Sequence, residues 1–281
     1  MHIEPGIVTG AKLVLSYATG LATGCFAAKL VVETMREQGA LSFAVRAMAA
    51  SGLVFTFFEI LPHFAVGVSE VHFILGSTLF LLFGAAPAAS GLAVGLLLQG
   101  VLFVPTDLPQ YGMNVTTLLV PLFAIHALAK RLVPSNTAYP DLQYSKALAL
   151  STAYQSGIVV WVAFWAFYGA GFGVANLYNI AWFTVSYALV ALVQVEADLV
   201  VPGARETNWA AWLPAEFSPT ACRRHVAVDN NDGRRVVRFA QAMHTLSLIA
   251  TGCSDPRRLA LAAIRISRRL AAGRLRPPAR Q

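Results

Sequence analysis

Apolar residues are gathered into seven long runs along the chain, separated by short stretches rich in polar residues, glycine or proline. The runs lie at 9–33, 43–62, 71–86, 90–106, 114–133, 147–170 and 176–201. Each is long enough, or nearly so, to cross about 30 Å of hydrocarbon as a helix. The third and fourth are short, and only an Ala-Ala-Pro-Ala-Ala turn at 85–89 divides them. The pattern predicts an all-α, polytopic membrane helix bundle with about seven transmembrane helices.

Composition supports the same class. The chain has 281 residues, of which 57% are apolar and 12% are charged, and its mean hydropathy is +0.60. Soluble domains carry about 25% charged residues. The chain is therefore expected to be a multi-pass membrane protein.

Charge divides the chain into two regions. Residues 1–204 hold seven Lys and Arg against nine acidic residues, whereas residues 205–281 hold fourteen Arg, no Lys and five acidic residues. We therefore expect a transmembrane domain at 1–202 and a basic, partly irregular tail at 203–281. Apolar residues at helical spacing within the tail predict amphipathic helices. Their arginines suit a surface of anionic lipid, and no pattern typical of nucleic-acid binding accompanies them.

The positions of Lys and Arg predict the orientation of the bundle, because these residues cluster in cytoplasmic loops. None occurs between Arg46 and Lys130, or between Lys146 and Arg205. With seven spans, the basic stretches share one side only if the N-terminus lies outside and the C-terminus is cytoplasmic. The first apolar run has no basic segment before it, so Met1 and His2 are expected in the mature protein. The expected location is the cell inner (plasma) membrane.

Ionisable residues within membrane spans are costly, so each is a candidate for function. The candidates within or directly beside the predicted spans are Glu59, His63, Glu70, His72, Asp107, His126, Glu196 and Asp198. The last two are interpreted as structural, and a packing role is favoured for His126. The chain has no HExxH, GxSxG or GxxxxGK[ST] motif, so zinc-protease, hydrolase and phosphate-loop chemistry find no support. No enzyme activity is expected, and any ATP hydrolysis must occur on separate partner chains.

The first two residues offer an unusual set of metal donors. A free α-amine on Met1, the backbone nitrogen of His2 and its imidazole Nδ1 can occupy three corners of a square around one ion. Such nitrogen donors favour Ni(II), Cu(II) or a cobalt ion over Mg(II), Ca(II) or Zn(II), and the amide binds only when the metal displaces its proton. Alternatively, His2 is merely part of a polar terminus.

A second stretch carries a family resemblance. The opening MHIEPG resembles the MHI-x-x-G start of the CbiM/NikM family, the substrate-binding membrane components of energy-coupling-factor (ECF) transporters for cobalt and nickel. A family segment SHPTGTGLGAILFGP, followed by a Gln and by LGAN, has its counterpart in VHFILGSTLFLLFGAAP (71–87), Gln99 and YGMN (111–114). Phe73 stands where the family has proline, and Pro105-Thr106-Asp107 replaces an expected His-Gly-Gly, so the chain is a divergent relative.

The resemblance implies a site and a set of partners. The donors that it implies are Met1, His2 and His72, and the supporting residues are Glu4, Gln99 and Asn114. The chain would then capture Ni²⁺ or Co²⁺ as transported substrate, with no cofactor. Its partners would be an ECF transmembrane coupling protein, ATPase subunits, a small accessory membrane subunit and the lipid bilayer, with no nucleic acid.

Two alternatives come from other classes. One is a metal-dependent integral membrane enzyme that uses Glu59, His63, Glu70 and His72. The other is a permease component for an organic solute or a metal chelate, in which the Met-His start has no role. Within the leading hypothesis, His63 and Glu70 are alternative ligands. The sequence does not separate nickel from cobalt.

Overall fold

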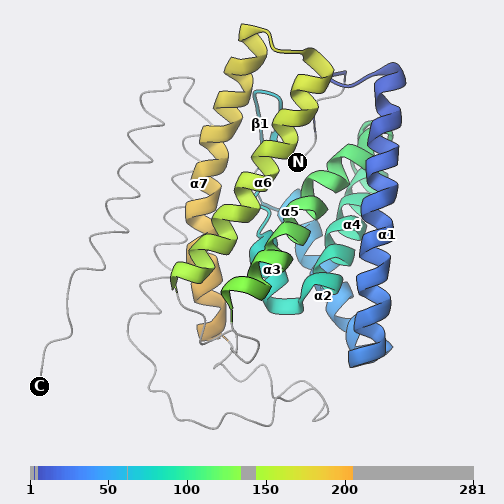
Figure 1. The fold of residues 1–281 in the computed structure, drawn as a ribbon, viewed down its shortest axis with the longest axis vertical. Coiled ribbons are helices and arrows are strands. Elements are labelled where there is room, and N and C mark those ends of the chain that lie inside the picture. The colour runs from blue at the N-terminus through green and yellow to red at the C-terminus, as the bar shows by residue number, and fades with distance from the viewer. Residues whose placement is uncertain (1–2, 4–5, 62, 134–143, 205–281) are drawn as a thin grey trace, which may run out of the picture. The chain divides into compact units, whose positions relative to one another are not determined.

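The computed structural model describes residues 3, 6–61, 63–133 and 144–204. Its helices are α1 (Leu13–Gln38), α2 (Ala40–Glu59), α3 (Gly76–Phe83), α4 (Ala85–Leu102), α5 (Tyr111–Leu132), α6 (Tyr144–Ala170) and α7 (Val174–Ala204). Short 3-10 helices, η1 (Gly10–Lys12) and η2 (Pro105–Gln110), precede α1 and α5. Strands β1 (Phe64–Val66) and β2 (Ser69–Val71) form a hairpin, which follows α2 and precedes α3 in the sequence (Figure 1).

Six helical segments in the described part of the chain are long and apolar enough to cross a membrane. They are 10–38, 40–59, 85–102, 105–132, 145–170 and 174–191. Large apolar side chains on α1, such as Leu21 at 71% exposure, face outward from the bundle, as expected of a surface in contact with lipid. The predicted class, an all-α polytopic membrane bundle, is confirmed.

The third predicted span is wrong. Residues 71–86 do not form one helix: β2 ends at Val71, residues 72–75 form a coil, and α3 has only eight residues. The predicted turn at 85–89 is also wrong, because these residues are the first turns of α4. The break falls at Gly84, whose φ of +87° lies in the region that favours glycine. The segment between the second and third predicted runs is largely the β-hairpin.

Small residues bring the helices of the bundle close together. On α4, a Cβ added to Gly91 would lie 2.5 Å from the Cβ of Ala50 on α2. On α5, a Cβ added to Gly112 would lie 2.6 Å from the carbonyl oxygen of Ser16 on α1. Such close approach of backbones is typical of membrane helices, where packing replaces the hydrophobic effect between helices.

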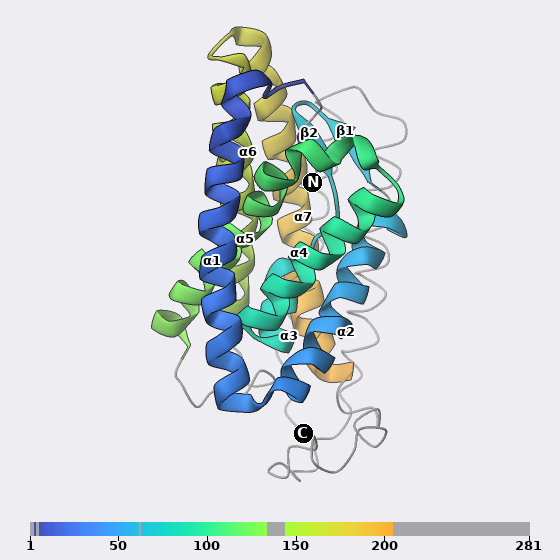
Figure 2. The same ribbon diagram turned by 90° about the vertical axis from the view of Figure 1, so that its right-hand side faces the viewer.

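The hairpin and the start of α1 lie at the same end of the bundle (Figure 2). Lys12 ties this end together, because its Nζ donates hydrogen bonds to the carbonyl oxygens of Tyr168 and Gly169 at 2.9 and 3.0 Å. These carbonyls close the C-terminal turn of α6, where a positive charge is favourable. The chain before α1 is therefore held to the bundle at two positions, Lys12 and Ile3.

Candidate metal site

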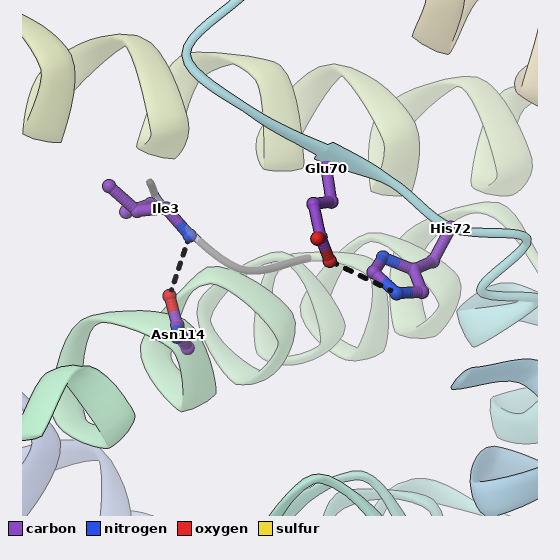
Figure 3. A network of polar contacts seen from close by, with 4 residues as sticks. All are labelled: Ile3, Glu70, His72 and Asn114. Atoms are coloured by element: carbon purple, nitrogen blue, oxygen red, sulfur yellow. Dashed lines mark hydrogen bonds and ion pairs between the residues drawn. The ribbon is translucent and has the colours of Figure 1, made fainter. Parts of the chain in front are cut away.

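Ile3 anchors the N-terminal segment inside the bundle. Its backbone N–H donates a hydrogen bond to Oδ1 of Asn114 on α5 at 3.1 Å (Figure 3). Ile3 also forms an antiparallel bridge with Ser69 of β2. Its side chain is 1% exposed and packs in a cluster with Val8, Met113 and Trp165. Two backbone contacts and a buried side chain thus hold the third residue of the chain beside the hairpin.

The hairpin is positioned by its own turn. Gly67 has a φ of +66°, and a Cβ added there would lie 2.1 Å from the carbonyl oxygen of Asn179 on α7. Only glycine fits both the backbone conformation and this close approach. The two strands pair antiparallel, with Phe64 opposite Val71 and Ala65 opposite Glu70. This register directs the end of β2, and His72 after it, into the bundle.

His72 is buried and enclosed by rings. Its side chain is 1% exposed, and Oε2 of Glu70 lies 3.6 Å from its Nε2 (Figure 3). The ring of His63 stacks on it with a centroid distance of 4.8 Å and an interplanar angle of 12°. The ring of Phe58, on α2, meets it edge-on at 5.0 Å. These contacts fix the plane of the imidazole, which is a requirement for a metal ligand held in one geometry.

The predicted site residues fall into three groups. The structure brings His72, Glu70 and His63 together. Asn114 is connected to the same hairpin through Ile3, which bonds to Asn114 and forms a bridge with Ser69. Gln99 is 3% exposed on α4, and its Oε1 has no hydrogen-bond partner among the described residues. Met1, His2 and Glu4 lie outside the described residues. Within the described ranges, no three His, Cys, Asp or Glu side chains are grouped so that they could hold a metal ion.

A comparison with protein families decides the class of the protein. The model of the CbiM family, described as the cobalt uptake substrate-specific transmembrane region, matches residues 2–201. The chain belongs to the CbiM family. Comparisons with curated proteins and with solved structures found no match. As a CbiM protein, the chain is a substrate-specific component of cobalt uptake, and hence a multi-pass membrane component of transport.

This CbiM chain also contains a buried polar network that the sequence analysis did not identify. Gln155 on α6 is 2% exposed and donates a hydrogen bond to the carbonyl oxygen of Ile74 at 3.2 Å, and its side chain contacts that of Gln194 on α7. With the Gln194 amide turned so that its oxygen faces α3, this oxygen accepts from the N–H groups of Gly76 and Ser77, each at 3.0 Å. The network holds the coil after His72 and caps α3.

The sequence offered a weak indication of this network. Polar amides within otherwise apolar membrane helices usually bond to a neighbouring helix. Gln155 and Gln194 fit this pattern, but neither carries a charge and neither lies in a segment that resembles the family motifs. The amides position the segment that carries His72, so they belong to the support of the candidate site.

Proposed function

We propose that this CbiM protein captures Ni²⁺ or Co²⁺ as the substrate-specific subunit of an ECF-type uptake transporter. The ion would be bound by the α-amine of Met1, the amide and imidazole nitrogens of His2, and the imidazole of His72. The observation that carries this proposal is the anchoring of Ile3 by Asn114 and Ser69. It holds the residue directly after His2 within the bundle, beside the strand that leads to His72.

Chain geometry supports the donor set. Consecutive Cα atoms are about 3.8 Å apart, so residue 2 lies within one such step of the anchored Ile3. Because the bridge between Ile3 and Ser69 is antiparallel, continuing this pairing backward from Ile3 would lead toward the residues that follow Ser69. That direction leads to His72, three residues beyond Ser69. The proposal requires Met1 to be the first residue of the mature chain.

Membership of the CbiM family supports the proposed assembly. A transmembrane coupling protein, ATPase subunits and a small accessory membrane subunit would be separate chains in the inner membrane. The N-terminus would lie outside, where the ion arrives, and the basic tail would lie in the cytoplasm. Co-purification of a polytopic membrane protein and an ATPase with the tagged chain tests this assembly.

Binding selectivity tests the proposed donor set. Calorimetry on the purified full-length chain in detergent is expected to give Ni²⁺ and Co²⁺ affinities at least about 100-fold above those of Mg²⁺ and Ca²⁺, since the latter ions prefer oxygen ligands. Equal affinity for Mg²⁺ would mean that oxygen atoms hold the ion, and it would overturn the proposed donors.

The hydrogen bond from Ile3 to Asn114 gives a second test. In Asn114→Ala, the buried N–H of Ile3 loses its acceptor, so the N-terminal segment should be held less firmly. Ni²⁺ affinity should fall about 10- to 100-fold, the range for residues that support a metal ligand. Thr117→Ala is a matched control, because Thr117 is buried on the same helix and, among the described residues, its hydroxyl bonds only within its own helix, to the carbonyl oxygen of Met113. Equal affinity of both variants would argue against anchoring through Asn114.

A further inference from the structure

Three donor side chains share one face of the β-hairpin. Phe64 pairs with Val71, so one further step in the same register places His63 opposite His72. Side chains alternate between the faces of a strand, and directly opposed residues share a face. Glu70, two residues before His72, therefore lies on that face as well. The 4.8 Å ring stacking of His63 on His72 and the 3.6 Å contact of Glu70 with His72 agree with this arrangement.

These donors differ in their exposure to solvent. His63 is exposed, the Glu70 side chain is 32% exposed, and the His72 side chain is 1% exposed. An ion that approaches this face therefore meets an imidazole first, then a carboxylate, and last the buried imidazole of the proposed holding site.

His63 and His72 do not hold one ion together in this arrangement. An imidazole nitrogen binds a metal through a lone pair in the plane of its ring. The two ring planes differ by only 12° and are stacked, so an ion in the plane of His72 lies well out of the plane of His63. His63 is thus unsuited to be the fourth donor beside His72, although it is suited to bind the ion at a different time.

Glu70 is placed to share an ion with His72. Its Oε2 lies 3.6 Å from Nε2 of His72, beyond the usual length of an N–H···O hydrogen bond. Nitrogen and oxygen ligands bind ions such as zinc at about 2.0–2.2 Å, so two ligand atoms on one ion are at most about 4.3 Å apart. The observed separation falls below this limit. The carboxylate can contact an ion while that ion is also in contact with His72.

We infer that His63 and Glu70 form an entry site, which takes up a hydrated divalent transition-metal ion and passes it to His72. This inference rests on the proposed function, because it assumes that His72 is a ligand of the held ion. During the transfer the ion would exchange water for His63 and Glu70, and would then exchange these two ligands for His72 and the nitrogens of Met1 and His2. The protons displaced from the His2 amide and the Met1 ammonium would pass to solvent with the released water, and no electron is transferred.

The kinetics of binding test this inference. His63→Phe keeps a ring for stacking on His72 but removes the donor nitrogen, and Glu70→Gln removes the charge. Association with Ni²⁺ is measured by rapid mixing of the full-length protein in detergent, and dissociation by a chelator chase. The association and dissociation rate constants should each fall about tenfold in each variant. Favourable local charge raises association rates by about tenfold or more, and its loss should lower them by a similar factor. Kd should stay within about twofold, since an entry site sets rates but leaves the final state unchanged.

The control lies on the same face of the hairpin. Ala65 is exposed, shares that face and carries no donor, so Ala65→Ser should bind Ni²⁺ at the rates of the unaltered chain. An unchanged Kd also reports that each variant has folded.

Other outcomes would overturn the inference. Association of His63→Phe at the unaltered rate would mean that His63 serves only in packing. A large rise in Kd with faster dissociation would make His63 a ligand of the held ion. Failure of the unaltered chain to bind Ni²⁺ or Co²⁺ would instead overturn the proposed function, and the entry site with it.

Discussion

Extending the chain by three residues ahead of Met1 is expected to lower its affinity for Ni²⁺ and Co²⁺ by at least about 100-fold. Removal of a residue that only supports a metal ligand lowers metal affinity by up to about 100-fold, and the loss of a ligand should cost at least as much. The extension moves the free amine away from His2, and the two fused chelate rings can no longer form. The amide nitrogen then has no neighbouring amine to hold the metal that displaces its proton. Calorimetry on the purified chain measures the change.

The length of the extension matters. A single added residue would place the histidine third, where the amine, two amides and the imidazole can form a different chelate with four nitrogens. Three residues avoid this. The same three residues added after Gln281 are the matched control and should leave affinity unchanged. Unaltered binding after the N-terminal extension would show that the amine is not a ligand.

Replacing His72 should cause a loss of similar size. His72→Gln keeps much of the side-chain volume between His63 and Phe58 but removes the imidazole nitrogen. Three donors from Met1 and His2 would remain, without the one that ties them to the bundle, and Ni²⁺ affinity should fall at least about 100-fold. Binding is measured by calorimetry, and a thermal unfolding midpoint close to that of the unaltered chain confirms the fold.

The companion variant His63→Ala distinguishes the two histidines. If His63→Ala abolished binding while His72→Gln did not, the alignment of residues 71–87 with the family motif would be wrong. His63 would then replace His72 in the proposed donor set.

Most of the helices could be predicted because a membrane span has a simple requirement. A run of about 20 apolar residues satisfies it, and α1, α2 and α4 to α7 each overlap one of the predicted runs. The predicted ends differ from the observed ones by several residues, as for α4, which begins at Ala85 rather than residue 90. The hydropathy of a sequence does not show where a helix begins when the neighbouring residues are also apolar.

The hairpin and α3 could not be predicted, for a related reason. A buried strand, a buried coil and a buried helix all have apolar side chains, so the run at 71–86 does not reveal which one it forms. A glycine such as Gly67 or Gly84 is compatible with a turn or a break, but glycine also occurs inside helices, so neither residue is decisive alone. The pairing of His63 with His72 depends on the strand register, which periodicity alone does not give.

The candidate site was predicted in part by resemblance. Asn114 was identified through the YGMN segment, but its bond to the N–H of Ile3 depends on how the N-terminal segment enters the bundle. The role predicted for Gln99 stays a prediction, as do the roles of Met1, His2 and Glu4. Contacts between residues more than a hundred positions apart, such as Ile3 and Asn114, have no local pattern in a single sequence.

The central claim is that four nitrogens hold the ion, and X-ray absorption at the metal edge tests it most directly. The measurement uses the full-length chain loaded with one equivalent of Ni²⁺. The account predicts a square-planar ion with four nitrogen donors, and the loss of this signature in the chain extended ahead of Met1. A six-coordinate ion bound mainly by oxygen, or one with a sulfur ligand, would contradict it.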